Sequence, residues 1–235
     1  MPYTYNIHIT SKKILIIFSL ISLGFLLIYY LPYFFDMKYG YFISDYMNIT
    51  QEKNVPTFFS FFIMMLVGLV YFLLYKEEKK YYWLLISLFF VYLGFDDMFK
   101  IHEYVGSDVG HSVIEDGLDK EFSTYYWQAV FMPMFALFGL YTVYVTSKAF
   151  WDISCKKCIV MLFAGYGLYA VAIAMDFYEG MDTDLFWLLE IFKTLDYDAL
   201  VDVMRATEEA IEMLGGTLIL ASLLYLKEIK ISISS

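Results

Sequence analysis

Apolar residues fill six stretches of the chain, and charged residues and short polar segments separate them. A helix needs roughly 20 apolar residues to cross a hydrocarbon layer of roughly 30 Å, and each stretch reaches that length. The pattern therefore predicts an all-α, polytopic membrane helical bundle with about six transmembrane helices, at residues 14–35, 56–75, 81–104, 125–147, 158–178 and 205–226.

Two further segments refine this prediction. Residues 184–193 are apolar with sparse charges and too short to cross, which is typical of a short interfacial helix. The first stretch follows Lys12 and Lys13 like a signal peptide, but it has no small-residue cleavage site, so we expect a retained helix. Residues 1–235 are then predicted to form a single transmembrane domain.

Composition supports a membrane protein and excludes one class of partner. Hydrophobic residues make up 60% of the chain and aromatic residues 21%, whereas soluble domains are about 45–50% apolar. Arg205 is the only arginine and no basic patch is present, which argues against nucleic-acid binding. The expected surroundings are a lipid bilayer, with other subunits of a membrane complex as possible partners.

The lysines indicate an orientation. Short loops on the cytoplasmic side of membrane proteins carry an excess of basic residues. If the N-terminus is cytoplasmic, the short segments on that side hold ten of the sixteen basic residues. We therefore predict a multi-pass protein of the cell membrane with both termini in the cytoplasm, and cytoplasmic lysines at positions 12, 13, 76, 79, 80, 148, 156, 157, 227 and 230.

Several carboxylates lie inside the predicted spans. Asp96 follows Lys80 by sixteen residues, and Glu212 precedes Lys227 by fifteen. At about 1.5 Å per residue, both lie roughly 22–24 Å along a helix, still within the roughly 30 Å layer. Acids at such a depth are rare and usually face the interior of the bundle. The sequence thus predicts a shallow acidic layer near the outer surface.

Helical phase groups these acids. On the sixth span, Glu208, Glu209 and Glu212 share a face with Arg205. On the third, Asp96 shares a face with His102 and Glu103, whereas Asp97 is expected to point elsewhere. Carboxylates with one imidazole suit a divalent metal such as iron, manganese or zinc. The predicted ligands are Asp96, His102, Glu103, Asp176, Glu208, Glu209 and Glu212.

A structural explanation competes with the metal site. The sixth span begins on the outer side, and acids in the first turns of a helix are favoured by its dipole. The acids would then be hydrated helix ends without a ligand.

Two motifs carry a resemblance. One runs from Asp96-Asp97 through four residues to His102-Glu103, and the other is Glu208-Glu209-Ala210-Ile211-Glu212. They resemble a pattern in uncharacterised prokaryotic multi-pass membrane proteins, where the first motif usually begins with Asp-Glu rather than Asp-Asp. The resemblance covers only these two helices and implies no activity.

Three functions remain open at this point, and so does the question of whether the protein is an enzyme. The first is a metal-dependent membrane enzyme acting on a lipid or other apolar substrate, with Arg205 orienting an anionic head group. The second is a proton- or cation-coupled transporter that uses the same acids. The third is a non-catalytic accessory subunit of a larger membrane complex.

Cys155 and Cys158 stand apart from these acids. Both lie in a predicted cytoplasmic loop with no further metal ligand nearby, so we expect two reduced thiols there.

Overall fold

The computed structural model describes residues 10–35, 46–51, 53–102, 104–105, 126–180 and 197–234. These residues form long helices and no strand, so the predicted all-α bundle is confirmed. The helices are α1 (Ser11–Phe35), α3 (Val55–Glu78), α4 (Tyr81–Phe99), α6 (Tyr126–Asp152), α7 (Lys156–Gly180) and α9 (Tyr197–Ser234).

Each predicted span coincides with one of these helices. Within the described residues, five of them (α1, α3, α4, α7 and α9) are long and apolar enough to cross a membrane. The helix for the remaining predicted span, α6, has 27 residues and contains Pro133, and it is not among these five. The predicted interfacial helix at 184–193 lies outside the described residues.

Local signals explain where α3 begins and ends. The Asn54 side chain accepts a hydrogen bond from the Thr57 N–H at 3.1 Å, and Pro56 occupies the first turn, where its missing N–H is harmless. Lys79 ends the helix in a left-handed conformation, with φ 57°. In the tight turn that follows, the Lys80 ammonium lies 2.9 Å from the Glu78 carboxylate. The hydrogen bond to this carboxylate raises the pKa of Lys80 above its ordinary value.

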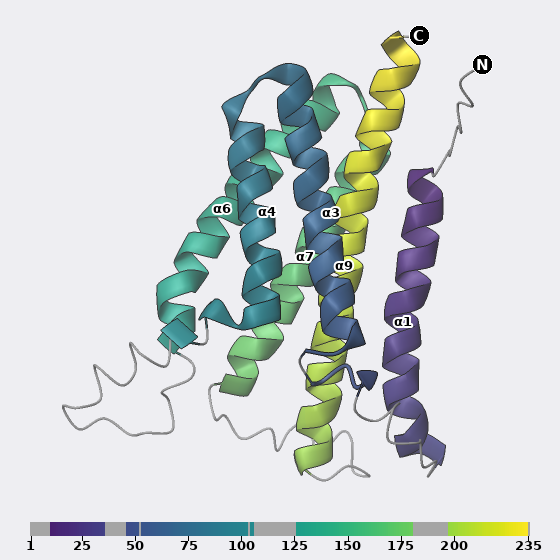
Figure 1. Cartoon of the computed structure of the whole chain (residues 1–235), viewed down its shortest axis with the longest axis vertical. Coiled ribbons are helices and arrows are strands. Elements are labelled where there is room, and N and C mark those ends of the chain that lie inside the picture. The colour runs from purple at the N-terminus through teal and green to yellow at the C-terminus, as the bar shows by residue number, and fades with distance from the viewer. Residues whose placement is uncertain are drawn as a thin grey trace, which may run out of the picture.

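The helices alternate in direction (Figure 1). The N-terminal end of α1, the α3–α4 turn, the α6–α7 turn and the C-terminal end of α9 lie at one end of the bundle, which we call the termini end. The C-terminal end of α4 and the N-terminal end of α9 lie toward the opposite end, which we call the acid end.

The helix α9 is the centre of the packing. It contacts α1, α3 and α7, while α4 packs on α3 and α6 packs on α7. Two glycines bring α7 and α9 into backbone contact: a Cβ at Gly165 would lie 2.8 Å from the Gly215 carbonyl oxygen, and a Cβ at Gly215 would lie 2.9 Å from that of Gly165. Small residues of this kind allow membrane helices to approach closely.

Aromatic side chains fill the interior toward the termini end. The Tyr71 ring on α3 stacks on Trp83 and Phe90 of α4, with centroid distances of 5.7 and 5.5 Å. The Tyr71 hydroxyl lies 2.9 Å from the Thr146 hydroxyl of α6, so the buried phenol is satisfied by a hydrogen bond. This contact links the α3–α4 pair to α6.

The expectation of two reduced thiols is wrong for this structure. Cys155, which immediately precedes α7, forms a disulfide with Cys158 in the first turn of α7. The predicted cytoplasmic location and the lack of further metal ligands indicate free thiols, but neither bears on whether the turn can hold a disulfide. A turn that begins a helix brings residues i and i+3 together, and here their Cα atoms are 5.4 Å apart.

Candidate acidic site

Three carboxylates from two helices come together at the acid end. Asp97 lies near the end of α4, and Glu209 and Glu212 lie one turn apart on the same face of α9. One oxygen from each carboxylate lies within 4.8 Å of the other two, and all three residues are half-buried. We call these residues the acidic triad. Together they offer a compact set of oxygen ligands.

The hydrogen bonds of the described residues satisfy only part of the Asp97 carboxyl. Ser60 of α3 hydrogen-bonds to this carboxyl, yet Oδ2 is buried and has no hydrogen-bond partner among the described residues. Buried polar atoms in native proteins are almost always bonded to protein, water or an ion. Three carboxylates at this separation also repel one another when ionised. Lys100 interacts electrostatically with Glu209 and His102 with Asp97, but two such groups do not balance three carboxylates, so bound protons or a bound cation must balance the rest.

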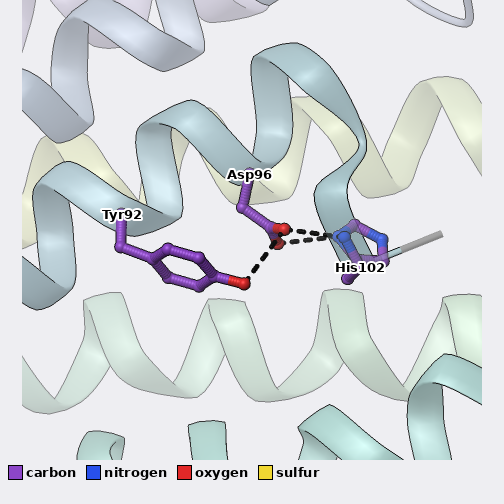
Figure 2. Close-up of polar contacts among 3 residues, drawn as sticks. All are labelled: Tyr92, Asp96 and His102. Atoms are coloured by element: carbon purple, nitrogen blue, oxygen red, sulfur yellow. Dashed lines mark hydrogen bonds and ion pairs between the residues drawn. The ribbon is translucent and has the colours of Figure 1, made fainter. Parts of the chain in front are cut away.

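Asp96, the chain neighbour of the triad residue Asp97, forms a carboxylate–histidine pair with His102, and Figure 2 shows this pair. Lys100 ends α4 with φ 51°, and the chain then turns so that His102 folds back on Asp96. Asp96 Oδ1 accepts the His102 backbone N–H at 2.9 Å, and Oδ2 lies 2.7 Å from His102 Nδ1. The Tyr92 hydroxyl donates to Asp96 Oδ1 over a longer 3.4 Å. Only 4% of Asp96 is exposed, so these hydrogen bonds replace the water that would otherwise solvate its carboxylate.

This pair also orients the imidazole. A histidine that donates its Nδ1–H to a carboxylate keeps the lone pair on Nε2, which is how metal-binding histidines are commonly held. His102 and Asp97 are close enough to interact electrostatically. The pair thus has both a structural role, closing the end of α4, and a geometry compatible with a ligand role.

The helix α7 contributes a tyrosine to the same region. Tyr169 interacts electrostatically with all three acids of the triad, and its hydroxyl lies 3.5 Å from the Met64 sulfur of α3. Two glycines of α9 leave room for it, since a Cβ at Gly215 would lie 3.0 Å from the Tyr169 ring and one at Gly216 would lie 3.3 Å from its hydroxyl. Because Gly215 and Gly216 have no side chains, the Tyr169 phenol can lie beside the acids.

The predicted ligands separate into groups. Glu209 and Glu212 belong to the triad, and Asp96 and His102 form the adjacent pair. Asp176 interacts electrostatically with Glu212, as Glu208 does with Glu209. Arg205 is exposed on α9. Glu103 lies outside the described residues.

Asp97 was missed, because the prediction that it points away from the site is wrong. The helix α4 packs on α3 through a stripe of buried residues that includes Ser87, Phe90 and Gly94. Asp97 continues this stripe three residues after Gly94, at helical spacing. The small residues Ser87 and Gly94 were a signal for the face that meets α3, and hence for the direction of Asp97.

The fold and the triad define a class: an all-helical protein with membrane-compatible helices and an acidic cluster at one end of its bundle. The chain belongs to the family described as a domain of unknown function (DUF8692), whose model matches residues 14–226. No curated protein and no solved structure matches the chain. The family agrees with the resemblance to uncharacterised proteins, and it names no activity.

Proposed function

We propose that the acidic triad binds a divalent cation, and that this cation forms the active centre of a membrane enzyme that acts on a lipid or other apolar substrate. The observation that carries the proposal is the triad itself. Three ligand oxygens lie within 4.8 Å of one another, and Asp97 Oδ2 is buried with no hydrogen-bond partner among the described residues.

The donor set indicates the kind of metal. Carboxylate oxygens suit hard divalent cations, and an imidazole nitrogen shifts the preference toward manganese, iron or zinc. Mn²⁺ accepts both kinds of ligand, so it is the best probe for the triad with or without His102. Asp176, Glu208 and Glu103 remain candidates to complete the ligand set.

A set of only three protein ligands is what a catalytic metal site requires. Three protein ligands leave coordination positions for water or substrate, and a bound divalent cation supplies Lewis-acid chemistry there. Around the bound cation, the reaction site would also include the Asp96–His102 pair and the Tyr169 phenol, which lie beside the triad. Arg205 is exposed one turn from Glu209 on α9, where it can attract an anionic head group.

The distribution of acids favours this proposal over a transporter. A proton or cation path across a membrane needs polar groups at successive depths. In the described spans the acids within the apolar stretches gather toward the acid end. Between these acids and the charged residues at the termini end, no charged residue occurs in residues 63–75 of α3, 81–95 of α4, 158–175 of α7 or 213–226 of α9.

The metal is tested on protein purified in mild detergent, stripped with chelator and reloaded with Mn²⁺. We expect about one Mn²⁺ per chain, and a loss of at least tenfold in affinity for Asp97→Asn and for Glu212→Gln. Asp202→Asn removes the same charge from α9 outside the triad and should bind like the wild type. Wild-type protein without stoichiometric Mn²⁺, or unchanged binding by Asp97→Asn, would contradict the cation site.

The enzyme is tested separately. Mn²⁺-loaded wild type and Asp97→Asn are each incubated with a membrane lipid extract, and the lipids are compared by mass spectrometry. A lipid consumed only by the wild type would identify the substrate class. Stoichiometric metal with no lipid consumed would support a non-catalytic role.

A further inference from the structure

The disulfide at the termini end lies in a setting that suits reversible chemistry. Cys155 and Cys158 form a Cys-x-x-Cys motif with Lys156 and Lys157 between them. Cys155 immediately precedes α7, and Cys158 lies in its first turn. The site is at the other end of the bundle from the acidic triad, so it is independent of the proposed metal centre.

The start of α7 favours a negative charge on one of the two sulfurs. The Cys158 backbone N–H donates to Cys155 Sγ at 3.3 Å, as an N-terminal cap would accept it. Free N–H groups and the helix dipole stabilise anions at this position. Lys156 and Lys157 are exposed and add positive charge beside the sulfur. Cysteines in such surroundings ionise readily, and the thiolate is the reactive form.

Burial distinguishes the two sulfurs. Cys158 is fully buried within the hydrophobic core, whereas Cys155 retains 8% exposure. The Cys155 backbone is held by its N–H bond to the Phe150 carbonyl at 2.9 Å and by its own carbonyl, which accepts the Ile159 N–H at 3.2 Å. The motif is thus fixed in position, with Cys155 on the solvent side and Cys158 behind it.

The predicted orientation bears on the same pair. The lysines predict that the termini end faces the cytoplasm, where structural disulfides rarely persist and disulfides that do form are usually catalytic or redox-sensing. A disulfide between Cys155 and Cys158 on the cytoplasmic side is explained if the pair alternates between a dithiol and a disulfide.

We propose that Cys155 and Cys158 form a redox-active dithiol–disulfide centre that exchanges with low-molecular-weight thiols and disulfides such as glutathione. In the oxidising direction, the Cys155 thiolate attacks a sulfur of glutathione disulfide and releases one glutathione thiolate, forming a mixed disulfide. The Cys158 thiolate then attacks Cys155 Sγ and releases the second glutathione. One disulfide is consumed and one formed, and the two thiol protons leave with the two glutathione molecules.

The first test uses the wild-type protein in detergent. It is equilibrated with buffers of increasing ratio of reduced to oxidised glutathione and quenched with acid. The quenched protein is then labelled with a maleimide of known mass in denaturant near neutral pH, so that both cysteines are accessible. We expect the protein to pass reversibly from no label to two labels per chain with an unchanged circular dichroism spectrum. A disulfide that resists excess glutathione until the protein is unfolded would overturn the proposal, as would a dithiol that never oxidises.

Single variants test the order of attack. Cys158→Ser should accumulate a stable adduct of one glutathione on Cys155, because no second thiol is present to release it. Cys155→Ser should remain unmodified in the folded protein, since Cys158 is buried, and should react only in denaturant. Equal adduct formation by both variants, or none by either, would contradict the assigned roles. The wild-type titration decides the proposal even if one variant folds poorly.

Discussion

Asp96 and Asp97 are neighbours in the chain with different surroundings. Successive residues of a helix point about 100° apart, so one carboxylate turns toward His102 and the other toward α3 and α9. Asp96 accepts a backbone N–H and faces an imidazole nitrogen, whereas Asp97 has an oxygen with no partner among the described residues. The first is a satisfied structural group, and the second is available to a ligand.

This difference gives a prediction for Asp96. Asp96→Ala should lower stability by about 1–3 kcal/mol, because the backbone N–H of His102 and its imidazole both lose their acceptor. Asp96→Asn keeps an oxygen for the backbone N–H and should lose less. His102→Ala should fall between wild type and Asp96→Ala. The measurement is the midpoint of thermal unfolding in detergent. If all three variants unfold at the midpoint of the wild type, the pair does not hold the end of α4.

At the residue scale, the sequence predicts the participants better than their grouping. Glu209 and Glu212 were predicted as ligands from depth and helical phase, and they lie together as the phase requires. The exclusion of Asp97 failed because the face of a helix that meets its neighbours depends on which neighbours those are. Asp97 lies with Glu209 and Glu212 of α9, which follow it by more than 100 residues in the chain, so no local pattern connects them.

Between elements, close packing depends on a few glycines. Gly165 and Gly215 place the backbones of α7 and α9 against each other, whereas Gly167, two residues further along α7, has no atom within 4 Å of the position that a Cβ would take. The three positions therefore allow a comparison between glycines at a close helix contact and a glycine outside it, on the same pair of helices.

Alanine substitutions at these positions should separate the effect of helix packing on stability from the effect of helix propensity. Gly165→Ala and Gly215→Ala bring a methyl group against a carbonyl oxygen that cannot move alone, and we expect a loss of about 1–3 kcal/mol. Gly167→Ala should be neutral or stabilising by up to about 1 kcal/mol, since alanine is the better helix former. Thermal unfolding measures all three. Similar losses at positions 165 and 167 would contradict the close contact between α7 and α9.

Across the whole molecule, both ends of the described chain lie at the same end of the bundle (Figure 1). This arrangement agrees with an even number of crossings, as the hydrophobic pattern predicts. The side of the membrane on which that end lies remains a prediction from the lysines, because packing alone has no orientation relative to a bilayer.

Reporter fusions test the orientation. A reporter that is active only in the cytoplasm should be active when fused after Ser235 and silent when inserted near Ser107. A second reporter that is active only outside the cytoplasm should give the opposite pattern. Reversed activities would place the lysine-rich end outside and would overturn the orientation assigned from the basic residues.

The central position of α9 has a consequence for biosynthesis. An acidic residue at the centre of a helix opposes its entry into the bilayer from the translocon by about 2.5–3.5 kcal/mol, and α9 carries Glu208, Glu209 and Glu212 toward the acid end. It is also synthesised after α3, α4 and α7, the helices that surround its acids. The ribosome therefore delivers the most acidic helix when its binding partners are already in place. We expect α9 to insert by joining a nearly complete bundle, and to insert poorly when it is expressed alone.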